Sequence, residues 1–271
     1  CRMKKIVGKM LILTIALLCT PITVMAQENT VRVDAEEVFP DGKWQDYNLG
    51  VNEYVYCPIV LESNGRLDVS VQTNFINSHY VYLLDENYET IAYNAISGQG
   101  EAAPQTQNYS YDLAEGEYYI RVESWNECQG KFRIKAEFLE STAKDENKNT
   151  DFQNALLYTD PQVTGFLSSG NNGGDWAEKL PEGSQNFEDY YKLEAKEGIY
   201  NIRVTGADPE GSFECVIYDS GYMEMMHEYQ PTSFSADLKD GIYYVKVVSS
   251  GQKAGDYILR INNSEKDSSG N

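Results

Sequence analysis

The sequence predicts an all-β protein: two tandem, jelly-roll-like antiparallel β-sandwich domains that follow an N-terminal signal peptide. Three observations support this prediction. Apolar and polar residues alternate over short runs, no stretch combines a helical period with helix caps, and one motif occurs twice. The motif spans Asp112 to Val122 and again Asp237 to Val247, so the copies lie 125 residues apart. This offset is too long for a solenoid repeat and fits a whole domain.

Residues 1–26 have the pattern of a signal peptide. Basic residues, among them Arg2 and Lys4, precede an apolar run from Met10 to Leu18, and small residues ending at Ala26 supply a cleavage pattern. The apolar run is too short for a transmembrane helix, so no membrane span is expected. We therefore expect a secreted protein that is extracellular or loosely associated with the cell surface.

The composition is strongly acidic, with 42 acidic and 22 basic residues and a formal net charge of −20. Nucleic acids and anionic lipids are bound mainly through lysine and arginine, so neither is an expected partner. Acidity of this kind keeps a secreted protein soluble, and a specific role in binding cations is the alternative.

Residues 28–140 are predicted to form the first sandwich, from about eight short strands. The expected inward faces are Leu67-Val69-Val71, Tyr80-Tyr82-Leu84 and Tyr118-Ile120-Val122. The polar residues 141–150 are read as a linker because they offer almost nothing to bury.

Residues 151–264 are predicted to form the second sandwich, and residues 265–271 a polar tail. Its hairpin repeats the inward set with Tyr243, Val245 and Val247. Arg121 of the first copy and Lys246 of the second are expected on the exposed faces, because neighbours along a strand point to opposite sides.

The second copy carries an ordered set of strand motifs: Asp189-Tyr190-Tyr191-Lys192-Leu193, Val216-Ile217-Tyr218-Asp219, the hairpin, and Tyr257-Ile258-Leu259-Arg260-Ile261. This order resembles the bacterial pre-peptidase C-terminal (PPC) domains, which are similar in form to the collagen-binding domains of clostridial collagenases. The first copy is more divergent, with Glu53-Tyr54-Val55-Tyr56 and Leu83-Leu84-Asp85 in the same order. The resemblance implies tandem PPC-like sandwiches, and its motifs specify a fold better than a ligand.

Calcium is the one cofactor with a candidate location. The resemblance implies calcium near the segment that leads into the domain, and oxygen ligands gather there: Asn171, Asn172, Asp175, Glu178, Glu188 and Asp189. The spacing of an EF-hand is absent, and the alternative is a solvated loop with acidic turn residues.

Tyrosine is abundant, with 21 residues, and it suits binding faces because it combines contact area with a polar tip. The candidate ligand-binding residues are Tyr119, Tyr244, Tyr222 and Tyr229. Four more tyrosines are further possibilities: Tyr88, Tyr93, Tyr109 and Tyr111. The alternative is that these rings pack at sandwich edges or between the two copies.

No catalytic residue is predicted. The two histidines, His79 and His227, fall in separate copies, and the sequence holds no nucleophile elbow, metal-binding or phosphate-binding motif. Of the cysteines after residue 26, Cys57 and Cys128 either pair or stay free, and Cys215 is alone in its copy.

We expect a non-catalytic protein that binds an extracellular polymer, either a polysaccharide or a fibrous protein such as collagen. The alternative is an accessory or chaperone-like partner of another secreted protein, such as a protease.

Overall fold

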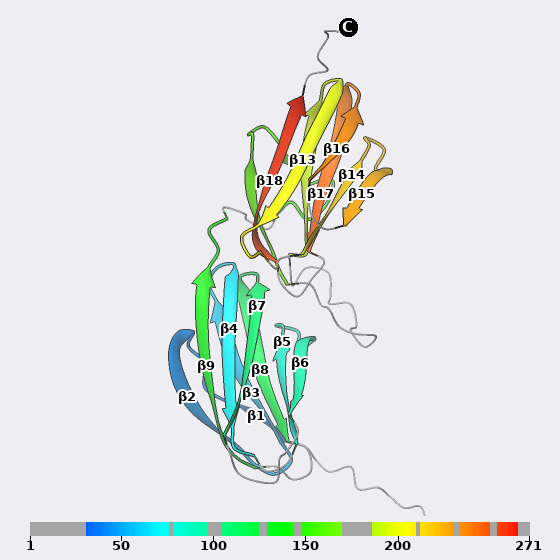
Figure 1. Ribbon diagram of the computed structural model, residues 1–271. Helices are drawn as coiled ribbons and strands as arrows, with labels where there is room; N and C mark the ends of the chain where they lie inside the picture. The colour runs from blue at the N-terminus through cyan, green and yellow to red at the C-terminus, as the bar shows by residue number, and fades with distance from the viewer. Residues whose placement is uncertain are drawn as a thin grey trace, which may run out of the picture.

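The computed structural model describes residues 31–75, 78–96, 104–124, 129–143, 148–169, 186–209, 212–229, 233–249 and 254–264. Over these ranges the chain forms β-strands and no helix, as the alternating pattern predicts (Figure 1). No helix in this part of the chain is long and apolar enough to cross a membrane. The predicted signal peptide and polar tail lie outside the described residues.

Within the described residues, the first sandwich has nine strands: β1 (Val31–Asp34), β2 (Asp41–Leu49), β3 (Glu53–Leu61), β4 (Gly65–Thr73), β5 (His79–Leu84), β6 (Thr90–Ile96), β7 (Gln105–Leu113), β8 (Gly116–Ser124) and β9 (Gly130–Glu140). One sheet has the order β1-β3-β8-β5-β6 and the other β2-β9-β4-β7. Neighbouring strands are antiparallel, except that β1 pairs with β3 in parallel.

The second sandwich consists of another nine: β10 (Leu156–Leu157), β11 (Val163–Leu167), β12 (Glu188–Ala195), β13 (Gly198–Gly206), β14 (Phe213–Tyr218), β15 (Glu224–Tyr229), β16 (Ser233–Leu238), β17 (Gly241–Ser249) and β18 (Gly255–Ser264). Its sheets have the orders β10-β12-β17-β14-β15 and β11-β18-β13-β16. Each strand takes the place of the strand nine positions earlier, and β10 again pairs in parallel with β12. The repeated motif therefore marks a repeated fold.

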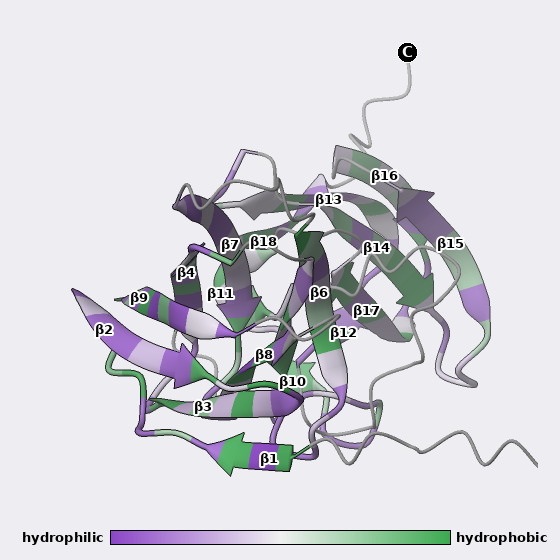
Figure 2. Ribbon diagram, turned by 90° about the horizontal axis from the view of Figure 1, so that it is seen from below, coloured by the Kyte–Doolittle hydropathy of each residue, from purple (hydrophilic) through white to green (hydrophobic). Residues whose placement is uncertain are grey.

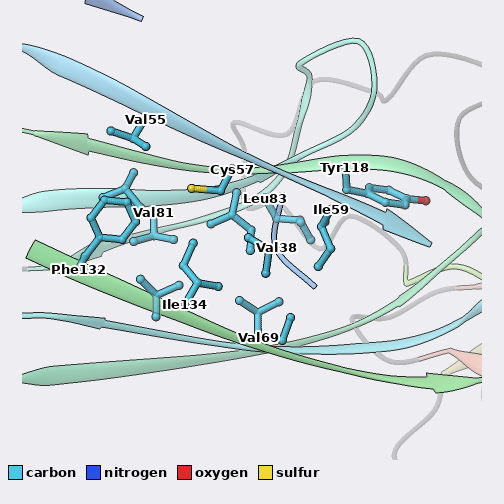
Figure 3. Close-up of a cluster of buried hydrophobic side chains, with 14 of the residues drawn as sticks. Val38, Val55, Cys57, Ile59, Val69, Val81, Leu83, Tyr118, Phe132 and Ile134 are labelled. Atoms are coloured by element: carbon cyan, nitrogen blue, oxygen red, sulfur yellow. The ribbon is translucent and has the colours of Figure 1, made fainter. Parts of the chain in front are cut away.

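The core of each sandwich lies between its two sheets. Figure 3 shows Cys57 and Ile59 of β3 facing Ile134 of β9 and Val69 of β4 across the first core. Along the strands, hydropathy alternates from residue to residue, as β9 shows in Figure 2. This alternation gives each sheet one packed face and one face toward solvent.

The hairpin faces were predicted correctly at five of six inward positions: Tyr118, Ile120, Val122, Val245 and Val247 are buried. Tyr243 is only half-buried, because it lies near the start of β17 with its hydroxyl at 3.3 Å from the amide of Lys239.

Two predictions about strand faces were wrong. In β5 the buried residues are His79, Val81, Leu83 and Leu84, so the prediction is confirmed at Leu84, whereas Tyr80 and Tyr82 lie on the outer face. Pairing fixes this register: Val81 is opposite the buried Val122 of β8, and a slip of one residue would exchange the faces.

The second error concerns Arg121 and Lys246, which are half-buried, with 22% and 17% of their side chains exposed. The Arg121 guanidinium carbon lies 3.8 Å from the ring centroid of Tyr82, and Lys246 forms an ion pair with Glu188. Long side chains on this face are covered by neighbouring aromatic rings, so facing outward does not make them fully exposed.

Candidate binding site

The outer face of the five-stranded sheet in the second sandwich carries a cluster of aromatic rings. Tyr190, Tyr244 and Tyr218 come from the adjacent strands β12, β17 and β14. Phe152, from the segment before β10, stands over them with ring centroids 4.7 Å from Tyr190, 5.0 Å from Tyr218 and 5.4 Å from Tyr244. Tyr222 completes the cluster, 4.5 Å from Phe152 and 5.4 Å from Tyr244. We call these five residues the second platform.

The first sandwich has a matching cluster, the first platform, made of Arg32, Tyr56, Tyr88 and Tyr119. The rings of Tyr88 and Tyr119 lie 4.6 Å apart, and that of Tyr56 lies 5.6 Å from Tyr88. The Arg32 guanidinium carbon lies 4.4 Å from the ring centroids of both Tyr56 and Tyr88. Arg32 thus stands in the first platform where Phe152 stands in the second, and cation–π attraction replaces ring packing.

Strand pairing shows that the platforms are equivalent positions of the repeat. Tyr119 and Tyr244 occupy the same place in the hairpin, 125 residues apart. Tyr56 is opposite Arg121, as Tyr190 is opposite Lys246, which is again 125 residues after Arg121. Both copies therefore place a tyrosine pair on neighbouring central strands of the outer face.

One tyrosine of each platform comes from a turn with unusual backbone geometry. Tyr88 has a φ of +65° and Tyr222 a φ of +63°, a left-handed conformation that bulky residues rarely adopt. Holding a residue there costs on the order of 1–3 kcal/mol. This strained conformation occurs at the corresponding place in both copies.

An aspartate holds each of these turns. The Asp85 carboxylate accepts hydrogen bonds from the amides of Asn87 and Glu89, both at 2.9 Å. Asp219 accepts them from Gly221 at 2.8 Å and Met223 at 2.9 Å. The result is that Tyr88 and Tyr222 project over the platforms with 40% and 49% of their surface exposed, whereas Tyr119 and Tyr244 beneath them are half-buried.

Hydrogen bonds and burial shift the pKa values of the phenol groups in the platforms. The Tyr119 hydroxyl lies 2.5 Å from a Glu117 carboxylate oxygen, and this contact raises the pKa of Tyr119. Hydrogen bonds with Tyr119 and Arg32 lower the pKa of Tyr88. Burial, with a hydrogen bond to Tyr222, raises the pKa of Tyr244. At neutral pH Tyr119 and Tyr244 keep their protons, so these two residues offer ring faces and hydroxyl groups.

The structure brings three of the four predicted ligand-binding tyrosines into the platforms: Tyr119, Tyr222 and Tyr244. Tyr229 lies elsewhere, at the far end of β15, where its ring stacks on His227 with centroids 4.1 Å apart. Tyr88 was named only among the further tyrosines. The signal that could have found it is the repeated Asp-x-x-Tyr turn, Asp85 to Tyr88 and Asp219 to Tyr222.

The other three tyrosines named from the sequence lie outside the platforms. Tyr93 stacks on Tyr82 with centroids 5.8 Å apart. Tyr109 and Tyr111 line an apolar cavity of about 10 Å³ between the sheets of the first sandwich. A space of this size holds one water molecule at most, so it is no substrate pocket.

The predicted calcium ligands are only partly within view. Asn171, Asn172, Asp175 and Glu178 lie outside the described residues. Glu188 is engaged by Lys246, and Asp189 is fully buried, with one carboxylate oxygen 2.6 Å from the Tyr257 hydroxyl and the other 3.2 Å from the Asn186 amide nitrogen. Nowhere in the described chain do three or more acidic, histidine or cysteine side chains group as metal ligands. Calcium therefore remains a prediction that rests on the loop.

His79 and Cys57 belong to the first sandwich, and His227 and Cys215 belong to the second. His79 is buried beside Phe75 in the first sandwich, and His227 lies 2.9 Å from Glu214 in the second. Burial raises the pKa of the Cys57 thiol and raises that of Cys215 to about 12, so both thiols are unreactive at neutral pH. Cys128, the other half of the disulfide considered above, lies outside the described residues.

Comparisons with known proteins show distant structural likenesses. No family model and no curated protein matches the chain. The PPC domain of a collagenase from Bacillus anthracis matches 40% of this chain and 99% of its own at 15% identity and a TM-score of 0.31. The PBSX exported protein XepA matches 82% of this chain and 87% of its own at 10% identity and a TM-score of 0.27. At these values the likenesses assign neither a family nor a ligand, and the β-sandwich fold rests on the chain's own strand pairing.

Proposed function

We propose that this protein is a secreted, non-catalytic binding protein of PPC-like domains that holds an extracellular polymer, a polysaccharide or a fibrous protein such as collagen, on its two aromatic platforms. The observation that carries the proposal is the pair of tyrosines held at positive φ, Tyr88 and Tyr222. A packing role alone would not require a tyrosine there, since glycine or asparagine fits a left-handed turn with less strain.

The chemistry of the platforms supports binding rather than turnover. Exposed rings beside hydroxyl and carboxylate groups suit the apolar faces and hydrogen-bonding edges of a sugar or a peptide chain. The net charge of −20 favours an uncharged or basic polymer over an acidic one, because like charges repel. Two equivalent platforms on one chain also suit a repetitive ligand, since the second contact forms at a high effective concentration.

Retention of the protein on insoluble glycans and on fibrous collagen tests this function and separates the two polymer classes. The His227→Gln variant should be retained as well as the wild type, because binding involves no acid–base step. Turnover of a bound polymer that is lost in His227→Gln would instead indicate an enzyme. Lack of retention on every polymer, with co-purification of one secreted protein, would support the accessory role.

A further inference from the structure

Asp112 stands out when the two copies of the repeat are compared. It is the last residue but one of β7, an edge strand of its sheet, and only 5% of its surface is exposed. Its counterpart 125 residues later, Asp237 of β16, is exposed. Both residues are followed by leucine and have the same place in the fold, so the difference comes from what covers Asp112.

The residues that cover Asp112 belong to the second sandwich, which meets the end of the first (Figure 1). The Asp112 amide donates to the Ser169 hydroxyl at 2.8 Å, and the Ser169 amide donates to the Asp112 carbonyl at 2.8 Å. The Asp112 carboxylate accepts a hydrogen bond from the Ala254 amide at 3.0 Å. Ser169 and Ala254 are 3% and 1% exposed, so these bonds are shielded from water.

Gly255 allows this close approach. Its φ of +73° lies in the left-handed region, and a Cβ at this position would lie 3.0 Å from a carboxylate oxygen of Asp112. Any other residue would therefore strain the backbone and crowd the aspartate at the same time.

Two further contacts lie on the same side of Asp112, along the next two strands of its sheet. Arg66 of β4 donates to Asp208, between β13 and β14, at 2.9 Å, and the two side chains are 27% and 16% exposed. Beyond β4, the Asp256 carboxylate of β18 accepts hydrogen bonds from Ser141 and Thr142, which directly follow β9. The start of the predicted linker is thus bound to the second sandwich.

We propose that these contacts form a clasp, with Asp112 at its buried end, that joins the two sandwiches into one rigid unit and fixes the two platforms relative to each other. The contacts of the clasp are hydrogen bonds and an ion pair, which an apolar pattern in the sequence does not reveal. The inference does not depend on the ligand that the platforms bind.

Backbone ¹⁵N relaxation of the full chain tests the clasp, because it reports how each sandwich tumbles. Wild-type protein should give one shared correlation time for amides of both sandwiches. The Asp112→Ala variant should lose the shared value and give two shorter ones, whereas the matched control Asp237→Ala, at the exposed counterpart, should keep it. Independent tumbling of the wild-type sandwiches, or a shared time that survives Asp112→Ala, would overturn the proposal.

A second variant tests the clasp in case Asp112→Ala disrupts the fold of the first sandwich. If amide shifts show that Asp112→Ala disrupts the first sandwich, Asp208→Ala removes a clasp contact from the other side of the junction. It leaves the Asp112 side chain in place. Asp208→Ala should shorten the correlation times of both sandwiches, and unchanged tumbling in this variant would also contradict the clasp.

Discussion

The ring of Tyr222 lies 5.4 Å from that of Tyr244, and Tyr222 reaches this place only with a backbone φ of +63°. Tyr88 and Tyr119 repeat the relationship in the first sandwich, at 4.6 Å and with a φ of +65° for Tyr88. A strained residue that recurs at equivalent places points to a requirement other than stability. We take that requirement to be an exposed ring at each platform.

Replacing Tyr222 by glycine and by alanine should separate the cost of backbone strain from the loss of ring packing. Both variants remove the ring, but only glycine adopts the left-handed conformation freely. Tyr222→Gly should therefore be more stable than Tyr222→Ala by about 1 kcal/mol, the reverse of the usual order inside a strand or helix. Urea unfolding of the two variants measures the difference. A Tyr222→Ala protein that is the more stable of the two would contradict the strain.

In the hairpin of the second sandwich, a substitution in the core should lower stability much more than a substitution of the adjacent residue. Val245 is fully buried, so Val245→Ala should lower the free energy of unfolding by about 1–3 kcal/mol. Lys246→Ala should cost less than about 1 kcal/mol, since it removes a partly exposed ion pair with Glu188. Equal losses in denaturant unfolding would show that the faces of β17 are misassigned.

The clasp should respond to pH through Asp112. Burial raises the pKa of its carboxyl above the ordinary 3.8, while the hydrogen bond from the Ala254 amide and the charge of Arg66 oppose the shift and Asp208 adds to it. A raised pKa means that the clasped state binds the proton more tightly. The contribution of this proton is fully present below the ordinary pKa and is lost as the pH rises through the raised one.

Asp112→Asn, which cannot ionise, supplies the comparison. As the pH rises from the ordinary aspartate range to neutral, the wild type should lose stability relative to Asp112→Asn. Thermal unfolding of the two proteins across this range measures the trend. A difference that stays constant with pH would contradict the assignment, and one of opposite sign would mean that the Ala254 hydrogen bond and the charge of Arg66 outweigh burial.

The two platforms should cooperate on a repetitive polymer. Tyr88→Ala and Tyr222→Ala should each weaken retention by removing a platform contact and, with it, the gain from a second contact on the same polymer. The double variant should be weaker than either single one. If one single variant binds as the wild type does, only the other platform is used.

The sequence predicted the architecture well where alternation is strict. Tyr118, Ile120 and Val122 follow a polar–apolar rhythm that only one strand face can satisfy, so their burial was predictable. In β5, by contrast, Tyr80 and Val81 are both apolar enough to face inward, and only pairing with Val122 settles the register. Where a strand rich in aromatic residues lies on a face that other rings cover, its hydropathy pattern does not show which side points inward.

The candidate site was predictable in part. Tyr119 and Tyr244 stood out because the hairpin repeats, but the rings that cover them come from turns, where a positive φ leaves no mark in a hydropathy pattern. Asp112 and Asp237 have nearly the same sequence surroundings, yet one is buried and the other is exposed. That difference depends on how the second sandwich meets the first, which local sequence does not specify.

The most direct measurement of the central claim is the retention of the Tyr88→Ala/Tyr222→Ala double variant on the insoluble polymer that holds the wild type. Its matched control is Tyr93→Ala/Tyr229→Ala, which removes two tyrosines that are 57% and 65% exposed and lie outside the platforms. The account predicts that the first pair weakens binding tenfold or more, about 1–3 kcal/mol per anchoring ring, and that the control binds as the wild type does. Equal retention of the two double variants would contradict it.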